Sequence, residues 1–479
     1  MSEFTFSRKR DGSFQVESYE GSSSVITIPS QHEDRPVTAI ADNAFSWSYQ
    51  IKKVIIPESV TQIGEAAFSW CESLTEIELP DTLRGIGEWA FIGCLSLRSI
   101  RLPAGIKKIS YSTFQSCSSL TSVELPDTVR SIGPEVFSEC RNLRSIKLSR
   151  TLNKIGDNAF ASCESLSAIE LPRQLTELGN NVFSGCSSLS SITVPSDHPV
   201  FEEQNGFLIN RAEKRLLFYP FGRKEKSVIV PDGIEIISEE AFAYRNHLEQ
   251  VTLPDSVRII EPKAFYSCRG LKEINLPDSI IRIGSNAFHS CSVLNAIRLP
   301  STLSIIDYSV FYACSSLQSV VLPEKLKIIA PCAFSGCANL ASVSFPEGLM
   351  EIGDSAFEGC RSVENIRLPK SLEALGSHVF GSCVMLDSVE LPSGVKTIPS
   401  QAFARCENLN SIVIPEGVEE IRSEAFESCI NLLSLELPAS LSEIDPTAFT
   451  DCRHLMLFVY PDSYAMNYAK DTGILFSEL

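Results

Sequence analysis

Residues 71–91, CESLTEIELPDTLRGIGEWAF, contain one complete copy of a pattern that recurs along most of the chain. Leu74, Ile77 and Leu79 follow the spacing L-x-x-I-x-L, and positions 77–79 alternate apolar, polar and apolar, as a half-buried strand requires. Pro80 has no backbone N–H and a fixed φ, so it ends this strand. The first half of the unit therefore predicts a short strand followed by a proline turn.

The second half of the unit returns the chain to its starting side. Leu83 and Ile86 predict a second short strand on the opposite side of the coil. Residues 87–91 predict a tight helical turn that closes the coil. Because one such unit cannot bury its apolar side alone, neighbouring units must stack into a continuous core. The pattern thus predicts a right-handed solenoid with mainly parallel strands about 4.8 Å apart.

Phenylalanine and proline mark the same repeat elsewhere in the chain. Seventeen of the 27 phenylalanines lie 23 residues apart, in two series over positions 45–183 and 242–449. Proline keeps this period over positions 57–195, apart from Ser149, and over positions 231–461. Two residue types in one register exclude a chance pattern, and the phenylalanines are the predicted core.

The repeat also divides the chain into predicted segments. These are an N-terminal cap with a first irregular repeat (1–56), regular repeats (57–195), an irregular insertion (196–230), further regular repeats (231–455) and a C-terminal cap (456–479). In the insertion, residues 206–210 and 215–219 predict two short strands of a hairpin. The insertion also gathers six basic residues, Arg211, Lys214, Arg215, Arg223, Lys224 and Lys226. It either binds a partner or is a structural island where the sheet changes direction.

Composition excludes several classes of protein. The net charge of -18 and the isoelectric point near 4.9 disfavour nucleic acid and anionic membranes as partners. The apolar runs are far shorter than the roughly 20 residues that a membrane-spanning helix needs, so no membrane insertion is expected. Residues 1–21 contain no apolar stretch of signal-peptide length. This absence favours a cytoplasmic location.

Cysteine forms a third column of the repeat. Fifteen of the 16 cysteines follow the repeat phenylalanine by three residues, and only Cys332 lies off the column. In-register side chains of parallel strands point the same way about 4.8 Å apart, whereas a relaxed disulfide needs Cβ atoms near 3.8 Å that point toward each other. We therefore expect buried, reduced thiols. Zinc binding and redox sensing stay open as alternatives, although no C-x-x-C supports them.

The sequence contains no recognisable catalytic, cofactor-binding or metal-binding motif. It has no H-E-x-x-H, P-loop, G-x-G-x-x-G or G-x-S-x-G pattern. The histidines are scattered and are interpreted as surface or turn residues: His32, His198, His247, His289, His378 and His454. Adjacent carboxylates such as Glu239 and Glu240 are interpreted as solvated. The chain is therefore predicted not to be an enzyme.

The outward strand positions are the best candidates for a binding function. In the first half of the chain this column alternates in charge, as in Glu124 and Lys147, which predicts a stabilising ladder. In the second half we select five candidates for binding a protein partner: Val321, Arg367, Glu390, Val413 and Glu436. Serine dominates the neighbouring column and leaves the face accessible.

An apolar cluster is predicted near the C-terminus. Val413, Leu433, Met456, Leu457 and Val459 fall on adjacent predicted strands, with Val459 counted in the outward column. Either the C-terminal cap folds over the last strands, or the cluster is a docking site. Val413 lies two coils before the cap and is expected to stay exposed.

The unit L-x-x-I-x-L-P-x-x-L-x-x-I-G-x-x-A-F-x-x-C resembles the BspA-like class of leucine-rich repeat over residues 29–460. That class occurs in many bacterial surface and secreted proteins and in some protists. The resemblance implies a leucine-rich-repeat solenoid that binds proteins. We expect a non-catalytic interaction scaffold for a protein of unknown identity. The alternative is a cell-surface or secreted adhesin that binds matrix proteins or host receptors.

Overall fold

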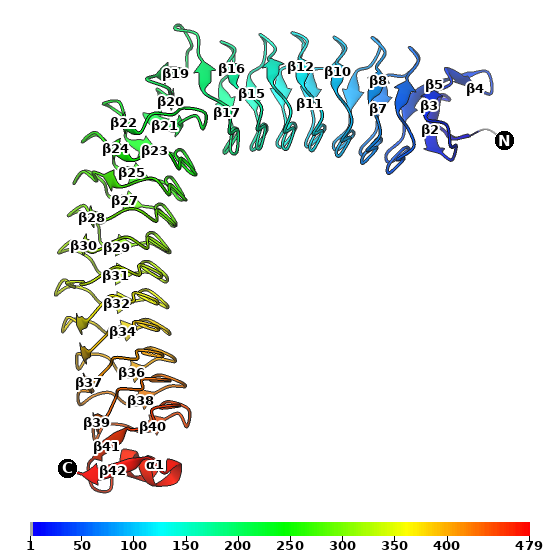
Figure 1. The fold of residues 1–479 in the computed structure, drawn as a ribbon. Helices are drawn as coiled ribbons and strands as arrows, with labels where there is room; N and C mark the ends of the chain where they lie inside the picture. The colour runs from blue at the N-terminus through cyan, green and yellow to red at the C-terminus, as the bar shows by residue number, and fades with distance from the viewer. Residues whose placement is uncertain (1–2) are drawn as a thin grey trace. The chain divides into compact units, whose positions relative to one another are not determined.

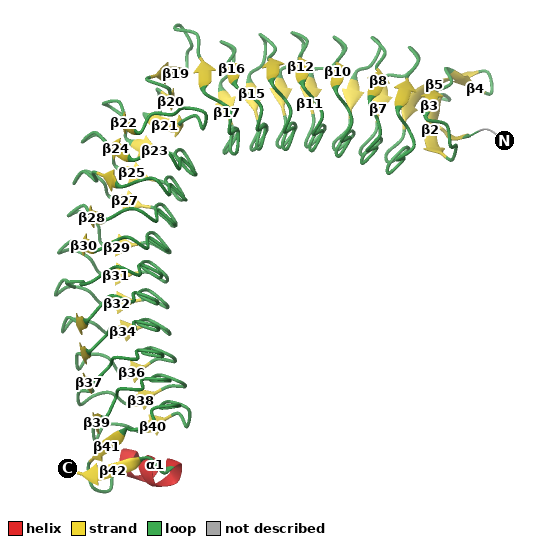
Figure 2. Cartoon of the chain, in the orientation of Figure 1, coloured by secondary structure: helices red, strands yellow, loops and turns green. Residues whose placement is uncertain are grey.

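The computed structural model describes residues 3–479, which fold into stacked coils of two short strands each (Figures 1 and 2). In the coil analysed above, β8 (Glu76–Glu78) has the burial pattern exposed, buried, exposed, and β9 (Gly85–Ile86) buries Ile86. β8 pairs in parallel with the strand 23 residues earlier, with Lys53 opposite Glu76. The predicted parallel solenoid is confirmed.

The first strands of successive coils form the first-strand column, whose middle side chain points into the core. In the N-terminal part these strands are β3 (Val25–Thr27), β6 (Lys53–Ile55), β8, β10 (Ser99–Arg101), β12 (Ser122–Glu124), β14 (Ser145–Lys147), β16 (Ala168–Glu170) and β18 (Ser191–Thr193). In the C-terminal part they are β22 (Ser227–Ile229), β24 (Gln250–Thr252), β26 (Glu273–Ile274), β28 (Ala296–Arg298), β30 (Ser319–Val321), β33 (Asn365–Arg367), β35 (Ser388–Glu390), β37 (Ser411–Val413), β39 (Ser434–Leu437) and β41 (Met456–Val459). We call the outward side of this column the sheet face.

The second strands form the second-strand column, which begins beyond each proline turn. Its N-terminal members are β5 (Arg35–Ile40), β7 (Gln62–Ile63), β9, β11 (Lys108–Ile109), β13 (Ser131–Ile132), β15 (Lys154–Ile155) and β17 (Glu177–Leu178). Its C-terminal members are β21 (Arg215–Phe218), β23 (Ile236–Ile237), β25 (Ile259–Ile260), β27 (Arg282–Ile283), β29 (Ile305–Ile306), β31 (Ile328–Ile329), β32 (Glu351–Ile352), β34 (Ala374–Leu375), β36 (Thr397–Ile398), β38 (Glu420–Ile421) and β40 (Glu443–Ile444).

The turn that closes each coil is not helical, so the predicted short helical turns are wrong. In all coils but that of Phe449, the residues two before and two after the repeat phenylalanine are left-handed, as at Trp89 (φ 56°) and Gly93 (φ 70°). This conformation aims N–H groups at the next coil: those of Trp89, Phe91 and Gly93 donate to carbonyls of that coil at 3.0, 2.9 and 2.9 Å. A helix would direct these N–H groups back to its own carbonyls.

The core is a stack of phenylalanine rings, as predicted. The rings of Phe68 and Phe91 lie 5.4 Å apart and 1° from parallel, and both side chains are fully buried. The cysteine column lies beside them. The Cys94 thiol donates to the carbonyl oxygen of Phe68 in the preceding coil at 3.2 Å, and each of the other column cysteines makes the equivalent bond. The sequence predicted buried free thiols, which the structure confirms for most of them, but not this hydrogen bond.

Arg245 replaces cysteine in the coil of Phe242. Its side chain is 1% exposed, and its guanidinium donates to the carbonyls of Ala243 and, at 3.4 Å, Ala241 in the same coil. These bonds solvate a charge that burial would otherwise penalise. Nothing in the cysteine pattern indicated a buried arginine.

Additional elements cover the first and last coils. At the N-terminus, β1 (Phe4–Arg8) pairs antiparallel with β2 (Phe14–Tyr19), β2 pairs in parallel with β5, and β4 (Gln31–His32) pairs antiparallel with β5. At the C-terminus, α1 (Tyr464–Thr472) contacts β40 and β41, and β42 (Leu475–Glu478) pairs in parallel with β41. The Ser463 hydroxyl accepts the Met466 N–H at 3.2 Å to cap the start of α1, and Gly473 ends the helix with φ 74°.

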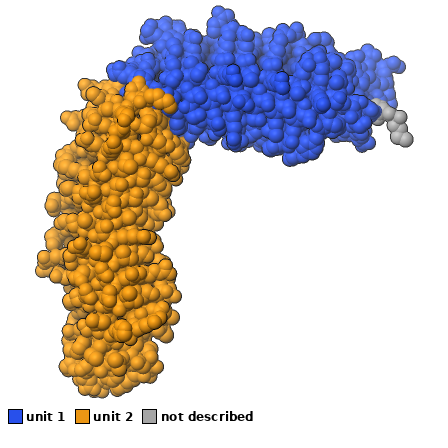
Figure 3. Space-filling view, in the orientation of Figure 1, with its two compact units in different colours: residues 1–212, 218–223 blue, residues 213–217, 224–479 orange. Residues whose placement is uncertain are grey.

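The chain divides into two compact units within the predicted insertion (Figure 3). Unit 1 comprises Met1–Ala212 and Phe218–Arg223, and unit 2 comprises Glu213–Leu217 and Lys224–Leu479. Both predicted strands of the insertion are present, as β20 (Phe207–Asn210) and β21. The structure adds β19 (Phe201–Gln204), which forms an antiparallel hairpin with β20. The segment boundaries inferred from the sequence otherwise stay a prediction.

Candidate interaction face

The alternation of each first strand places the five candidate residues on the sheet face of unit 2. Val321 ends β30 and Val413 ends β37, and their side chains are 59% and 64% exposed. Arg367, Glu390 and Glu436 are likewise exposed on β33, β35 and β39. Exposed aliphatic side chains are unusual in a column of polar residues, so the two valines are the strongest candidates for contact with a partner.

The strand register determines which of these residues are neighbours. Arg367 lies opposite Glu390, and Glu390 lies opposite Val413. Glu436 follows on the next coil, so four of the five candidates occupy successive coils. Val321 lies two coils before Arg367 and is separated from it by the coil of Ser344. The structure therefore brings together a four-residue row and leaves Val321 apart from it.

The electrostatics of this row are weak. The Arg367 Nε and Glu390 Oε2 atoms are 3.5 Å apart, and both side chains are mostly exposed. An exposed ion pair of this kind contributes about 0–1 kcal/mol. The Tyr460 hydroxyl donates to Glu436 Oε1 at 3.4 Å, and the negative charge of Glu436 raises the pKa of Tyr460. Val413 thus lies between two carboxylates, of which Glu390 is paired with an arginine and Glu436 with a tyrosine.

The C-terminal cluster is only partly as predicted. Leu433 and Met456 are 57% and 38% exposed, but Leu457 and Val459 are fully buried. The last coil is one residue shorter than the repeat, so Glu436 pairs with Phe458 rather than Val459. A shift of one residue moves every side chain of a strand to the opposite face. Counting Val459 in the outward column was therefore wrong.

Ile229 is an outward apolar residue that the sequence analysis missed. It ends β22 and is 69% exposed. Its strand falls in the insertion, where the 23-residue count was interrupted. Ile229, Val321 and Val413 are 92 residues apart, which is four coils. Extending the count backwards from Val413 would have found it.

The predicted ladder of ion pairs between outward residues of adjacent first strands is present in part of unit 1. Lys147 Nζ forms an ion pair with Glu124 on the preceding strand, and Lys53 Nζ lies 2.6 Å from Glu78 Oε1 on the following strand. Arg101 instead contacts Asp81 at 3.5 Å, in the proline turn. These exposed pairs link successive coils.

The basic residues of the insertion are also largely paired. The ion pairs are Arg211 with Glu202 (3.5 Å), Lys214 with Glu235 (2.6 Å), Arg215 with Glu261 (2.7 Å) and Lys226 with Glu249 (2.7 Å). Hydrogen bonds from Lys226 and Lys272 lower the pKa of Glu249 to about 2. Four of the six basic residues of the insertion therefore have their charge paired with a carboxylate.

His198 lies at a turn, where its N–H donates to the Pro195 carbonyl at 2.9 Å, but the residue is buried rather than on the surface. It is 1% exposed, and its Nδ1 accepts the N–H groups of Val200 and Phe201 at 3.1 and 3.0 Å. Burial is the main cause that lowers the pKa of His198. The ring thus organises the start of the β19–β20 hairpin, an interaction that depends on a folded loop.

The described residues were expected to hold no metal site, and their potential metal ligands are scattered. Across residues 3–479, no three His, Cys, Asp or Glu side chains are grouped so that they could hold a metal ion. Glu239 and Glu240 both lie 3.8 Å from Lys263 Nζ, so this pair of carboxylates is neutralised in part by one lysine. In the same part of the chain, no helix has the length and apolar character needed to cross a bilayer.

Comparison with known proteins identifies relatives of this architecture. A family profile described as BspA type Leucine rich repeat region (6 copies) matches residues 38–129, 107–205, 217–341 and 327–456. No curated protein matches the chain closely enough to count as a relative.

Several solved structures are similar to the chain. A leucine rich cell surface protein from Faecalibacterium prausnitzii is 25% identical with a TM-score of 0.54, over 89% of this chain and 97% of that one. A leucine-rich repeat protein from Bacteroides ovatus is 28% identical with a TM-score of 0.56, over 82% and 94%. A leucine-rich repeat protein from Eubacterium ventriosum, 22% identical with a TM-score of 0.58 over 79% and 92%, shares the fold.

Proposed function

Because the chain belongs to the BspA-type leucine-rich-repeat family, we propose that it is a non-catalytic scaffold that binds another protein through the sheet face of unit 2. The observation that carries this proposal is Val413, whose side chain is 64% exposed between the carboxylates of Glu390 and Glu436. Burying a valine side chain against a partner stabilises a complex by about 1.5–3 kcal/mol. The neighbouring Arg367–Glu390 pair would then set the charge pattern that the partner must match.

Substituting Val413 with glutamate is expected to weaken binding of the partner by at least about 10-fold. The change removes the apolar contact and places three carboxylates on successive coils, which corresponds to a loss of about 1.4 kcal/mol or more. The measurement is quantitative recovery of co-purifying proteins by the intact chain and by the Val413→Glu variant. Thermal unfolding of both proteins checks that the fold is unchanged.

The matched control is Val25→Glu. Val25 is a similarly exposed valine, at 57%, on β3 of unit 1. It introduces the same charge into a first strand outside the proposed site. Equal recovery of co-purifying proteins by wild type and by the Val413→Glu variant would show that Val413 is not part of the site. Equal losses with Val413→Glu and Val25→Glu would indicate a nonspecific charge effect.

A second proposal is that the protein acts as an adhesin at the cell surface. The supporting observation is that one solved structure with similar sequence and fold is described as a leucine rich cell surface protein. The cytoplasmic location expected from residues 1–21 has no support among the relatives, and we do not retain it.

Protease treatment of intact cells tests the surface location. A surface protein is expected to be digested while the cells are intact and a cytosolic marker is still protected, because the enzyme cannot cross the membrane. Immunoblots of the chain and the marker, before and after lysis, provide the measurement. Protection of the chain until lysis would contradict the adhesin role and leave the scaffold proposal in place.

A further inference from the structure

The outward side of the second-strand column, which we call the second-strand face, has a row of aliphatic residues in unit 2. Ile281, Ile305 and Met350 are 53%, 48% and 42% exposed, and Ile328 is half-buried. Ile281 and Met350 immediately precede β27 and β32, and Ile305 and Ile328 begin β29 and β31 (Figure 1). The four residues therefore lie on four successive coils.

The strand register makes these residues neighbours. Ile305 lies opposite Ile328, and Ile328 lies opposite Glu351, the residue after Met350. The coil of Ile281 stacks directly on that of Ile305, because their phenylalanine rings are 5.5 Å apart. The row thus extends along the stack for three coil spacings, or roughly 14 Å.

The equivalent positions of other coils show that the fold does not require apolar residues on this face. In unit 1 these two outward positions contain no aliphatic side chain, and in the last coils only Ala374. The unit 1 residues are Thr61, Gln62, Arg84, Gly85, Lys107, Lys108, Arg130, Ser131, Asn153, Lys154, Thr176 and Glu177. Those of the last coils are Glu373, Ala374, Lys396, Thr397, Glu419, Glu420, Ser442 and Glu443. A contiguous exposed aliphatic row is typical of an interaction surface.

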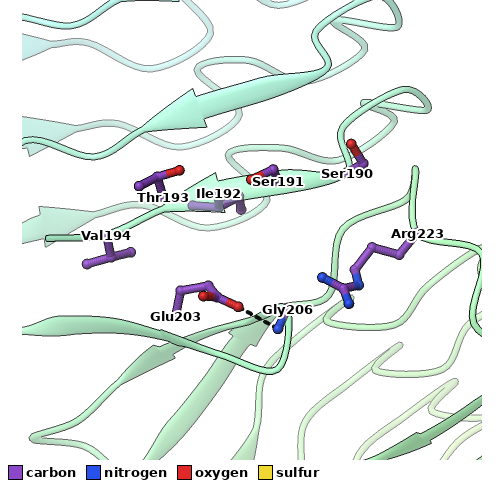
Figure 4. A pocket seen from close by; sticks show the side chains of 8 residues that line it. All are labelled: Ser190, Ser191, Ile192, Thr193, Val194, Glu203, Gly206 and Arg223. Atoms are coloured by element: carbon purple, nitrogen blue, oxygen red, sulfur yellow. Dashed lines mark hydrogen bonds between the residues drawn. The ribbon is translucent and has the colours of Figure 1, made fainter. Parts of the chain in front are cut away.

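The pocket beside β18 in unit 1 is a surface of a different kind. It has a volume of about 300 Å³ and is lined by residues 190–194, Glu203, Gly206 and Arg223 (Figure 4). Serine, threonine, glutamate and arginine form most of this lining. The Gly222 N–H donates to the Leu189 carbonyl at 2.6 Å, so the insertion lies against this strand. The aliphatic row of unit 2 is therefore the stronger candidate for apolar contact.

Two cations flank the aliphatic row. Arg282 follows Ile281 and Lys327 precedes Ile328, and both residues are exposed. Among residues 3–479, neither side chain has a carboxylate within ion-pair distance. Lys327 Nζ donates to the Gly348 carbonyl at 3.1 Å, which leaves its charge without a counter-ion. Cations beside an apolar row are complementary to an acidic partner with apolar side chains.

The carboxylates that follow the row limit where acidic groups of a partner can lie. Asp307 Oδ1 accepts the Ser285 hydroxyl at 3.0 Å and the Tyr308 N–H at 2.8 Å, so its hydrogen bonds are made within the coils. Glu351 is exposed beside Met350. An acidic partner would therefore place its carboxylates near Arg282 and Lys327 and away from Glu351.

The backbone of this face is largely bonded between coils. The N–H groups of Ile281, Lys327 and Met350 donate to carbonyls of the preceding coil at 2.8, 2.8 and 2.9 Å. A partner therefore contacts side chains here instead of adding a strand. A helix satisfies its own backbone groups, and its 5.4 Å turn is close to the coil spacing of about 4.8 Å. One apolar stripe of a helix can thus follow the row over about three turns.

We propose that the second-strand face of unit 2 binds an acidic amphipathic helix of a partner protein. The apolar stripe of the helix packs along Ile281, Ile305, Ile328 and Met350, and its carboxylates lie beside Arg282 and Lys327. This surface is formed by a different strand column from that of the sheet face. Either proposal can therefore fail without the other.

A peptide library tests this proposal on the full-length chain. The probes are peptides of about 15 residues with leucine fixed at the i, i+4, i+7 and i+11 positions of a helix. The other positions vary among glutamate, glutamine, lysine and alanine. Selection should favour glutamate over lysine beside the leucines. Failure to enrich any peptide, or selection for lysine, would overturn the proposal.

Fluorescence polarisation of the most enriched peptide tests the binding surface. Ile305→Glu should weaken binding at least about 10-fold, because it removes an apolar contact and repels the acidic helix. Arg282→Gln should weaken binding at least about 3-fold, and this loss should disappear when the peptide glutamates are replaced by glutamine. Thermal unfolding checks the fold of each variant. Binding that neither substitution changes would contradict the proposed surface.

Two matched variants are the controls. Val413→Glu adds the same charge at an exposed aliphatic residue of the sheet face, and Arg130→Gln removes an exposed arginine from the second-strand face of unit 1. Neither should change the affinity. Losses equal to those of Ile305→Glu and Arg282→Gln would show that the peptide does not recognise the aliphatic row, and would overturn the proposal.

Two further measurements test the chemistry of the partner. Proline at the centre of the enriched peptide should abolish binding, because proline breaks a helix. Undiminished binding of the proline peptide would exclude a helical partner. Sedimentation with vesicles of phosphatidylserine and phosphatidylcholine should leave the protein in the supernatant. Cosedimentation that Ile305→Glu abolishes would overturn the proposal in favour of a membrane surface.

Discussion

Replacing Phe288 with alanine is expected to lower the free energy of unfolding by about 3–5 kcal/mol. The Phe288 ring is fully buried between those of Phe265 and Phe311, with centroids 5.2 and 5.5 Å away and planes within 5° of parallel. Alanine would leave a cavity and interrupt the stack, and each ring pair contributes about 0.5–1.5 kcal/mol beyond burial. Denaturant unfolding followed by circular dichroism measures the loss.

Phe345→Ala is the matched control for this substitution. Phe345 lies outside the repeat column, is only partly buried, and contacts Phe357 edge-on at 5.5 Å. Its removal should cost clearly less than removal of Phe288. A loss for Phe288→Ala no greater than that for Phe345→Ala would mean that the phenylalanine stack does not stabilise the solenoid.

Raising the pH above about 8.5 is expected to destabilise the protein steeply through its buried thiols. Burial raises the pKa of Cys314 to about 12, and the same cause raises the pKa of Cys117, Cys268 and Cys383 to about 12. An unfolded thiol has a pKa of about 8.5. Below that pH both states keep the proton, and the stability due to the neutral thiol is fully present.

Above about pH 8.5 the unfolded state releases a proton that the folded state retains. Stability therefore falls by about 1.4 kcal/mol per pH unit for each such thiol, until the pH reaches the folded pKa near 12. The Cys314 thiol also donates to the Phe288 carbonyl at 3.1 Å, a bond that a thiolate could not make. The loss should grow with every buried member of the column.

Comparison with a Cys314→Ala variant isolates one thiol from the lysines and tyrosines that titrate in the same range. The stability advantage of wild type over the variant should shrink by about 1.4 kcal/mol for each pH unit between pH 9 and 11. Cys332→Ala is the control, because Cys332 lies off the column and is only partly buried. If the difference in unfolding free energy between wild type and Cys314→Ala did not change with pH, burial would not be keeping this thiol protonated in the folded state.

The candidate face shows where counting in 23-residue periods predicts side-chain exposure correctly and where it fails. Val321 and Val413 were found as exposed apolar residues because the middle residue of each first strand points inward and its neighbours point outward. The count failed where the coil length changed: Val459 is buried because the last coil is one residue shorter, and Ile229 was missed because the insertion interrupts the period. Exposure follows from sequence only while the register holds.

The stacked coils, the phenylalanine core and the proline turns could all be predicted before the structure was known, because each follows from the spacing of residues within one unit. The left-handed turns, the thiol bonds to phenylalanine carbonyls and the burial of His198 are visible only in the tertiary structure. Each of these depends on which atoms of a neighbouring coil or loop lie within hydrogen-bond reach. A pattern of residue types along the chain contains the period of the coils but not the positions of those partner atoms.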